Sequence, residues 1–215
     1  MSKSIGHMIA SSNPQRVLQK TISAKNIPDV LIHEIIDGIP LYRKGYRDVL
    51  AKTKTVEDIM GSSSLQAFLI TYLTIWIGKQ IDEHKYHILT NEAGLHLDRK
   101  NNLAGDLLIF DSSKLTIDKI NKNYASVPPL ISIEVDIDIA LEDLTAHSYI
   151  NLKTGKLLDF GTEKVIWFLT ESKKVMVATH DEGWQSFDWN RDVEILDSIT
   201  CNVGQYLKDK GSEFA

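Results

Sequence analysis

Hydrophobic residues recur at helical spacing over residues 62–83, the longest periodic stretch of the chain. This spacing predicts a helix with a broad apolar stripe packed on a sheet, and Ser62 to Ser64 provide N-cap candidates. Tyr72 and Trp76 lie on the stripe. Core packing is favoured for both over a role in a binding face, because large apolar side chains are usually buried.

Short segments rich in β-branched residues predict strands before and after this helix. Residues 31–43 hold two apolar runs separated by Asp37-Gly38, which predicts a hairpin, although Pro40 weakens the signal. Residues 130–136 alternate, with Ile131, Ile133 and Val135 on one face and Ser132, Glu134 and Asp136 on the other. Further strands are predicted at 86–91, 95–98, 106–111, 164–169, 175–180 and 184–189, with turns at 91–94, 99–102 and 171–174.

A second long helix is predicted over residues 140–160, with Gly161 as its C-cap. A helix start near Thr55 and one last short helix within 193–214 complete the pattern. This order of elements predicts an α/β (α+β) fold, with helices packed on a central mixed sheet. We expect residues 1–30 to form an N-terminal arm with a loose helix at 15–23, residues 31–190 to form the domain, and residues 191–215 to pack on it.

The amino-acid composition excludes several classes of protein. The 215 residues include 24 Lys and Arg against 29 Asp and Glu, a net charge of -5, which excludes nucleic-acid binding through bulk positive charge. A single cysteine, Cys201, excludes a disulfide framework and suits a reducing cytoplasm. There is no apolar run long enough for a membrane span and no signal-peptide pattern, so a cytoplasmic protein without membrane partners is expected. His84 and His87 lack the neighbours of a zinc site.

Two acidic residues stand out because each belongs to a predicted strand. Asp106 follows Gly105 and opens the strand GDLLIFD, and Glu134 lies on the polar face of LISIEVD. Two carboxylates from neighbouring strands, with a main-chain carbonyl such as that of Val135, form a hard-oxygen set suited to Mg²⁺ or Mn²⁺. From spacing alone, the alternative stays open that Asp106 only begins a strand and that Glu134 faces water.

Lys153 favours a functional site over this alternative. It shares the sheet-facing stripe of its helix with Tyr149, Leu157 and Phe160. A buried lysine is costly unless it meets a carboxylate or an anion, which favours a place beside the two acids. The alternatives are a lysine that snorkels at the edge of the stripe, and Lys156, one turn further on, in the same role.

The ordered set GDLLIFD, ISIEVD, a helix carrying Lys153 and GTEKVIWFLTESKKVMV resembles the Uma2 family, which has the PD-(D/E)XK restriction endonuclease-like fold. The resemblance spans roughly residues 31–178. It places Asp106, Glu134 and Lys153 on the family's Asp, Glu and helical Lys. The upstream segment HEIIDGIPLYR resembles the family's early hairpin and places Glu34 on the Glu of that hairpin.

The chain departs from the family pattern at a few positions. Gly105 stands where the family has Pro, and Asp136 stands where the wider nuclease fold has the lysine of its ExK motif. Asp136 and Asp138 occupy the region in which the family has a Ser. The family's His at the start of the long helix is missing, with Leu65 or Gln66 near that place. Activity would therefore depend on Lys153 reaching the site from the helix.

The resemblance implies a Mg²⁺-dependent endonuclease that hydrolyses DNA phosphodiester bonds with a metal-activated water. Asp106, Glu134 and the Val135 carbonyl would hold Mg²⁺ or Mn²⁺. Lys153 would orient the water or stabilise developing charge, and Glu34 would complete the shell. The alternative is a catalytically inactive nuclease-fold protein that serves as a nucleic-acid-binding or assembly module.

DNA is the expected partner, and a homodimer is compatible with the sequence. Since the net charge is negative, phosphate contacts must come from local cations, for which Arg99, Lys100, Lys114, Lys119 and Lys122 are the candidates. Any single one of them is more simply a solvated surface residue. Trp184 and Trp189 could form an aromatic platform for nucleic acid, but packing of a sheet edge on the C-terminal segment is favoured.

Overall fold

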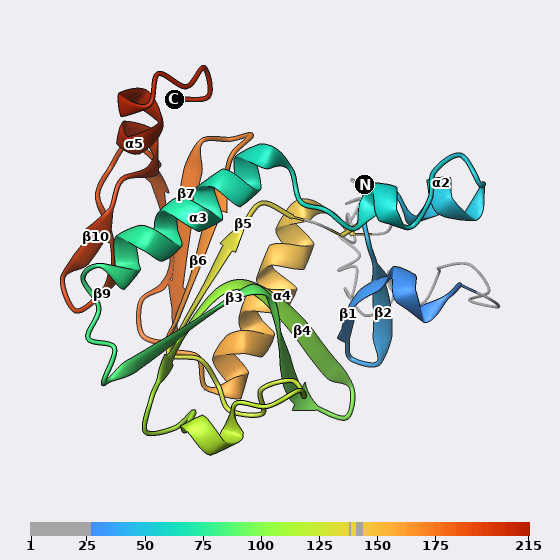
Figure 1. Cartoon of the computed structure of the whole chain (residues 1–215), viewed down its shortest axis with the longest axis horizontal. Coiled ribbons are helices and arrows are strands. Elements are labelled where there is room, and N and C mark those ends of the chain that lie inside the picture. Colours follow the sequence, from blue (N-terminus) through green and yellow to red (C-terminus); the bar gives the residue numbers. More distant parts are fainter. Residues whose placement is uncertain (1–26, 138, 141–143) are drawn as a thin grey trace, which may run out of the picture.

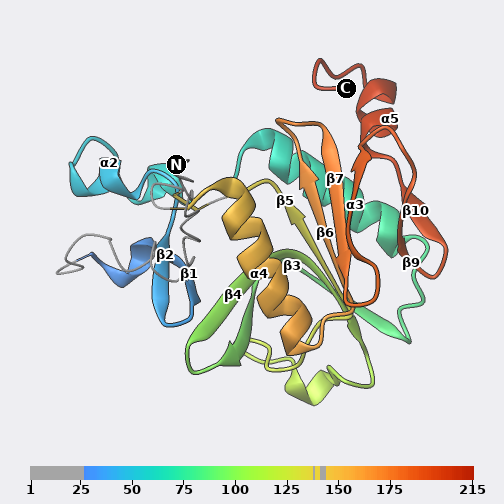
Figure 2. The ribbon, with the colours of Figure 1, turned by 180° about the vertical axis from the view of Figure 1, so that it is seen from behind.

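The computed structural model describes residues 27–137, 139–140 and 144–215. The loose helix expected at 15–23 lies outside these residues. The described part contains one large mixed sheet with a helix on each face (Figures 1 and 2). The α/β (α+β) class predicted from the order of elements is therefore confirmed. No helix in this part of the chain is long and apolar enough to cross a membrane.

The large sheet has the strand order β2-β1-β4-β5-β6-β7-β8, and β3 pairs with β4. Only β5 and β6 are parallel; the other pairs are antiparallel. The strands are β1 (Ile32–Ile36), β2 (Ile39–Tyr42), β3 (Tyr86–Asp98), β4 (Asn101–Asp111), β5 (Ile131–Val135), β6 (Lys164–Leu169), β7 (Lys174–Thr179) and β8 (Gly183–Asp188).

Two long helices cover the two faces of this sheet. α3 (Ser64–Gly78) lies in front of the sheet in Figure 1, and α4 (Ala146–Phe160) lies in front of it in the reverse view of Figure 2. One core contains Leu69 and Leu73 of α3 with Ile133 of β5. The other contains Tyr149 and Leu157 of α4 with residues of β4 and β6. The alternation of β5 thus sends its apolar residues toward α3 and Glu134 toward α4.

The boundaries of both helices follow from their caps. Ser63 accepts a hydrogen bond from the Gln66 amide and starts α3, as its sequence predicts. Thr145 accepts from the Ser148 amide, and Gly161 ends α4 in the left-handed conformation with φ 114°. α4 therefore begins at Ala146, and the predicted start at residue 140 is wrong. The sequence before the cap includes Ile139, which bridges to Arg43.

The predicted hairpin at residues 31–43 is confirmed as β1 and β2. Asp37 and Gly38 have φ values of 54° and 77°, as a two-residue type I′ hairpin turn requires at both positions. Pro40 lies in β2 at the edge of the sheet, where the missing N–H costs no ladder bond. In both views this hairpin stands beside the main body of the sheet.

The predicted turn at residues 91–94 is wrong. β3 runs without interruption from Tyr86 to Asp98, and Asn91 and Glu92, with φ values of 68° and 52°, form a bulge within it. Residues with a left-handed backbone often form a turn, but here they form a bulge that bends a continuous strand. β4 likewise begins at Asn101, not at Asp106.

Smaller elements complete the chain: η1 (Asp29–Leu31), α2 (Tyr46–Leu50), η2 (Glu57–Ile59), η3 (Ile117–Lys119), β9 (Val193–Leu196), β10 (Ile199–Cys201) and α5 (Val203–Asp209). The helix start expected near Thr55 yields only the three-residue η2. The short C-terminal helix is present as α5. It follows a β9–β10 hairpin that the sequence pattern did not predict. Leu207, Ile195 and Trp189 belong to the core on the α3 side of the sheet.

Core packing of Trp76 was predicted, and this is wrong. Its side chain is 41% exposed, and its indole N–H donates to the Thr200 carbonyl at 2.7 Å. Tyr72 is half-buried and stacks on Tyr206 of α5, with 3.6 Å between ring centroids. The stripe of α3 is wider than the sheet it covers, so its outer part faces the C-terminal segment and solvent.

Candidate active site

The candidate site lies at a fork in the sheet. β3 pairs with β4 along nearly all of its length, so β1 and β5 share the other edge of β4. β1 joins it at Asn102 and β5 joins it from Leu107 onward. Between these points the backbone of Ala104 is met by side chains instead of a described strand. Its N–H donates to Glu34 Oε1 at 3.0 Å, and its carbonyl accepts from Lys153 Nζ at 2.7 Å.

Three charged side chains meet at the fork. Lys153 Nζ lies 2.8 Å from Glu34 Oε1 and 2.8 Å from Glu134 Oε2. The three residues are only 1–4% exposed. The structure therefore brings together Glu34 from β1, Glu134 from β5 and Lys153 from α4, three residues that the sequence singled out. Lys153 does not snorkel to solvent, and Lys156 instead pairs with Asp37 in a partly exposed position.

Neutral donors fix the two carboxylates. The Tyr149 hydroxyl donates to Glu34 Oε2 at 2.6 Å, and the Ser132 hydroxyl donates to Glu134 Oε1 at 2.7 Å. Tyr149 precedes Lys153 by one helical turn, so both side chains leave α4 on the same face. Ser132 precedes Glu134 by two positions in β5, which places both on one face of the strand. The four-residue spacing in α4 and the two-residue spacing in β5 thus bring these side chains to the same cluster.

The surroundings shift the pKa values of all three charged groups. Burial raises the pKa of Glu134, and the attraction of Lys153 does not fully offset it. Burial also acts to raise the pKa of Glu34, but the charges of Lys153 and His33 and the hydrogen bonds from Lys153 and Tyr149 together outweigh it, and the pKa falls below its usual value. Burial alone would lower the pKa of Lys153, yet Glu134 and Glu34 raise it well above the usual range. Lys153 is therefore an ammonium ion at neutral pH and cannot act as a base.

Asp106 completes the set of predicted acids. It lines a small cavity, of about 10 Å³, together with Glu134 and Lys153. Asp106 Oδ2 accepts the amide N–H of Val135 at 2.7 Å, which continues the ladder between β4 and β5 through a side chain. This contact holds one carboxylate oxygen of Asp106 against the strand that carries Glu134.

The cavity is small, and acidic side chains gather around it. Its size is about that of one water molecule. Asp106, Glu134, Glu92 and Asp136 all line it, whereas Lys153 is the cation among its lining residues. Within the described part of the chain, no three His, Cys, Asp or Glu side chains form a complete shell. Mg²⁺ is commonly bound through one or two carboxylates with water as the remaining ligands, so Asp106 and Glu134 fit such an ion in kind.

Two further predicted site groups are already hydrogen-bonded. The carbonyl of Val135 accepts from Gln66 Nε2 of α3 at 2.9 Å, and Gln66 is 3% exposed. Asp136 leaves β5 with φ 61°, and its carboxylate accepts from the Thr170 amide and hydroxyl at 2.7 Å each. Asp136 therefore ties the end of β5 to the turn after β6. A carbonyl has a second lone pair, so the Gln66 contact leaves Val135 able to accept again.

The sequence reasoning missed two residues of the cavity, His33 and Glu92. His33 lies at an irregularity of β1, where the register shifts between Ile32 and Glu34, so that neighbouring residues approach the same site. Glu92 lies in the bulge of β3 opposite Asp106. The His33 Nδ1 atom is buried without a hydrogen-bond partner, and burial lowers the pKa of its ring. Bulges beside active sites are common, but no residue pattern in the chain marks either one.

The candidate DNA-contacting cations lie apart from this cavity. Arg99, Lys100, Lys114, Lys119 and Lys122 are all exposed. Lys114, Lys119 and Lys122 belong to the connection that enters β5 at Ile131, whereas Glu134 is near the opposite end of that strand. Trp189 is buried in the core with C-terminal residues, and Trp184 is 39% exposed on β8. Trp189 therefore cannot serve as a stacking platform.

Comparison with known proteins gives a likeness of fold. No family model matches the sequence, and no curated protein was found to be similar to it. Among solved structures, the fold is similar to a protein of Anabaena variabilis ATCC 29413 named a "putative nuclease belonging to DUF820". The TM-score is 0.55 at 12% identity, over 75% of this chain and 80% of the other.

DUF820 is the Uma2 family, so this likeness confirms the resemblance seen in the sequence at the level of the fold. The chain shares with that protein the arrangement of a mixed sheet and flanking helices. At this identity the likeness says nothing of individual site residues. The arrangement of Asp106, Glu134 and Lys153 rests on the geometry of this chain alone.

Proposed function

We propose that the protein is a metal-dependent nuclease that hydrolyses phosphodiester bonds of DNA. The observation that carries the proposal is the cavity at the fork of a nuclease-like fold, where Asp106 and Glu134 meet the buried ammonium of Lys153. The order of these residues along the chain agrees with the Uma2 resemblance, and the fold agrees with that of a protein named as a nuclease.

In this proposal Asp106 and Glu134 hold Mg²⁺ or Mn²⁺, with the carbonyl of Val135 as a third oxygen donor. The ion would supply a Lewis acid that lowers the pKa of water and offsets charge on the phosphate. Glu134 is held ready by Ser132 and Lys153, and Asp106 is held by the Val135 amide. Both carboxylates are therefore oriented before any ligand arrives, which reduces the cost of reorganisation during reaction.

Lys153 acts mainly as a positioning residue in this arrangement. Its ammonium has acceptors in Ala104, Glu34 and Glu134, which match its three N–H groups. Glu34 in turn is fixed by Tyr149 and the Ala104 amide, so its role is to anchor Lys153. Lys153 adds positive potential beside the cavity, which favours charge that develops on a phosphate there.

The same contacts favour the second candidate function, a nuclease-fold protein that binds without catalysis. Since the three N–H groups of Lys153 already have acceptors, Lys153 can contact a reacting water only if one of them is released. Asp136, which replaces the usual motif lysine, is engaged by Thr170. An activity assay separates the two functions.

The test is nicking of supercoiled plasmid DNA by purified protein with Mg²⁺ or Mn²⁺. We expect nicking that chelation abolishes, and we expect Asp106→Asn and Glu134→Gln to eliminate it while the proteins stay folded. Glu163→Gln, at an exposed position, is the matched control and should retain activity.

Isothermal titration of the same proteins with Mn²⁺ supplies a second readout. Heat of binding that disappears in Asp106→Asn supports the metal site even if the DNA tested is a poor substrate. If high protein concentrations give no metal-dependent cleavage and no metal heat, the nuclease proposal fails and the binding module takes its place.

A further inference from the structure

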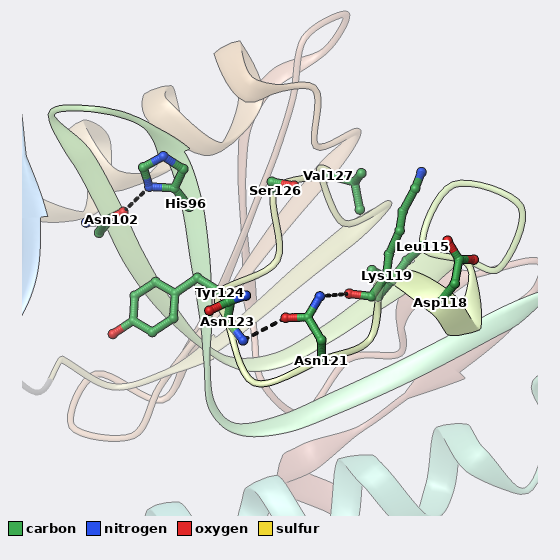
Figure 3. A pocket seen from close by; sticks show the side chains of 10 residues that line it. All are labelled: His96, Asn102, Leu115, Asp118, Lys119, Asn121, Asn123, Tyr124, Ser126 and Val127. Atoms are coloured by element: carbon green, nitrogen blue, oxygen red, sulfur yellow. Dashed lines mark hydrogen bonds between the residues drawn. The ribbon is translucent and has the colours of Figure 1, made fainter.

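A second hollow lies on the other side of the β3–β4 pair from the α4 core. It is a pocket of about 570 Å³, lined by residues of β3, β4 and the connection from β4 to β5 (Figure 3). Leu95 points into the core on the α4 side, so its neighbours Gly94 and His96 face the pocket side of β3. Binding sites for small ligands commonly have this size. Nothing in the proposed chemistry at the fork uses the pocket.

The most prominent group at the pocket is the ring of Tyr124. It is 58% exposed and lies against the backbone of Gly94. A Cβ atom on residue 94 would collide with ring atoms of Tyr124, so the glycine permits this close approach. The chain around Tyr124 is also fixed, because Ala125 exchanges backbone hydrogen bonds with Gly94 and His96. The ring is thus a positioned aromatic surface that faces solvent.

Polar side chains with both donors and acceptors surround this ring. His96 Nδ1 and Asn102 Oδ1 lie 2.6 Å apart on one side, and Asn121 and Asn123 lie on the other (Figure 3). Asp118 also lines the pocket. Amides and a carboxylate match the mixed edge of a nucleobase better than a phosphate, which a carboxylate would repel.

Cations suited to phosphates lie beside the pocket. Lys119 lines it, and Lys122 lies between Asn121 and Asn123 in the same connection. Arg99 and Lys100 lie in the turn between His96 and Asn102. One of the cations that the sequence offers for phosphate contacts therefore lines the pocket, and three others lie close to its lining residues in the sequence. This combination is typical of surfaces that bind single-stranded nucleic acid.

We propose that this pocket binds an unpaired nucleobase of a single-stranded DNA segment, stacked on Tyr124, with the neighbouring phosphates on the surrounding lysines. The choice of nucleic acid as the ligand rests on the proposed nuclease function. The pocket shares β4 with the site at the fork: Asn102 and Asp106 are four positions apart, about 13 Å along an extended strand. The substrate would be a single strand or a duplex with an unpaired segment.

The experiment measures fluorescence anisotropy of a labelled single-stranded DNA oligonucleotide and of its duplex, with EDTA present so that no cleavage occurs. We expect the wild-type protein to bind the single strand more tightly than the duplex. Tyr124→Ala should weaken single-strand binding about tenfold, as expected for loss of stacking of one base. Tyr124→Phe keeps the ring and should bind like the wild type.

Matched controls separate stacking in this pocket from binding elsewhere on the surface. Trp184→Ala removes another exposed aromatic side chain, on β8, and should leave binding unchanged. Lys122→Gln should reduce the dependence of affinity on salt by about one phosphate contact. Circular dichroism should show Tyr124→Ala to be folded, because the side chain is mostly exposed.

The result that would overturn the proposal is single-strand affinity unchanged in Tyr124→Ala, or duplex bound as tightly as the single strand. A protein that binds single strands through Tyr124 but never cleaves DNA with metal would retain this pocket and lose the nuclease function. Metal-dependent cleavage with no effect of Tyr124→Ala on binding would retain the nuclease and reject the pocket.

Discussion

The ammonium of Lys153 and the carboxylate of Glu34 form an ion pair at 2.8 Å in which neither residue is more than 2% exposed. Because Lys153 is also the partner of buried Glu134, the loss of the lysine leaves two buried carboxylates without a compensating charge. Lys153→Met should therefore lower the free energy of unfolding by about 3–5 kcal/mol. Urea denaturation followed by tryptophan fluorescence measures the change.

Lys156→Met is the control for this substitution. It removes a lysine from the same helix, but its pair with Asp37 is partly exposed, and we expect a change of about 1 kcal/mol or less. Equal losses in the two variants would show that the buried cluster does not hold the hairpin to α4.

The ionised form of Glu34 should contribute stability that depends on pH. Burial acts against this form, but the charges of Lys153 and His33 and the hydrogen bonds from Lys153 and Tyr149 together prevail, so the pKa in the folded protein lies below the usual value of 4.5. The contribution is present above pH 4.5 and is lost as the pH falls through the folded pKa. The difference in unfolding free energy between wild type and Glu34→Gln should thus be largest near neutral pH and shrink in acid. Urea denaturation at several pH values measures it.

Glu163→Gln is the comparison for Glu34, because Glu163 is exposed. It should stay within about 0.5 kcal/mol of the wild type at each pH. A difference for Glu34→Gln that grows as the pH falls would have the wrong sign, and it would mean that Lys153 does not stabilise the ionised form of Glu34.

Gly155 offers a stabilising substitution within the helix that carries Lys153. It lies in the interior of α4, and a Cβ at this position would have no heavy atom within 4 Å. Gly155→Ala should raise stability by about 0.5–1 kcal/mol, since alanine loses less backbone entropy in a helix. Thermal denaturation should show a higher midpoint. A lower midpoint would indicate that a methyl group at position 155 collides with a neighbouring part of the chain.

The C-terminal helix should be part of the folded core. Leu207 of α5 is fully buried on the α3 side of the sheet. Leu207→Ala should cost about 2–5 kcal/mol, the usual range for a large-to-small change in a core. Lys208→Ala, at the next and exposed position, should have little effect. If the two variants are equally stable, the C-terminal segment is not packed as the structure places it.

Periodicity predicted the elements that bury one face. The β1–β2 hairpin, α3 and strands β5 to β8 were all predicted close to their observed bounds, because each has a clear apolar repeat, whereas the β9–β10 hairpin was not predicted. Cap residues decide where a helix begins and ends, and they are harder to identify in the sequence than an apolar repeat. The run before α4 has helical composition, but Thr145 caps the helix, which begins six residues later than predicted.

The wrong predictions concern positions where contacts between distant parts of the chain decide the structure. Asn91 and Glu92 have the composition of a turn, yet pairing with β4 on both sides of them retains one strand. Trp76 belongs to the stripe of α3 by spacing, but the sheet does not extend beneath it. In the site, Glu134 and Lys153 were found because they lie at regular strand or helix positions, whereas Glu34 was found only through the Uma2 resemblance. His33 and Glu92 reach the cavity through irregular backbone, which periodicity does not predict.

At the fork, charged side chains help to hold the β1–β2 hairpin against β4 and α4. One ladder pair, Ile35 with Asn102, joins it to β4, while the Glu34 side chain reaches Lys153 and Tyr149 of α4. A ligand that pushed the hairpin aside would separate Glu34 from Lys153 and release one ammonium N–H toward the cavity. In that event the ion pair between Glu34 and Lys153 would restrain Lys153 only while the hairpin stays in place.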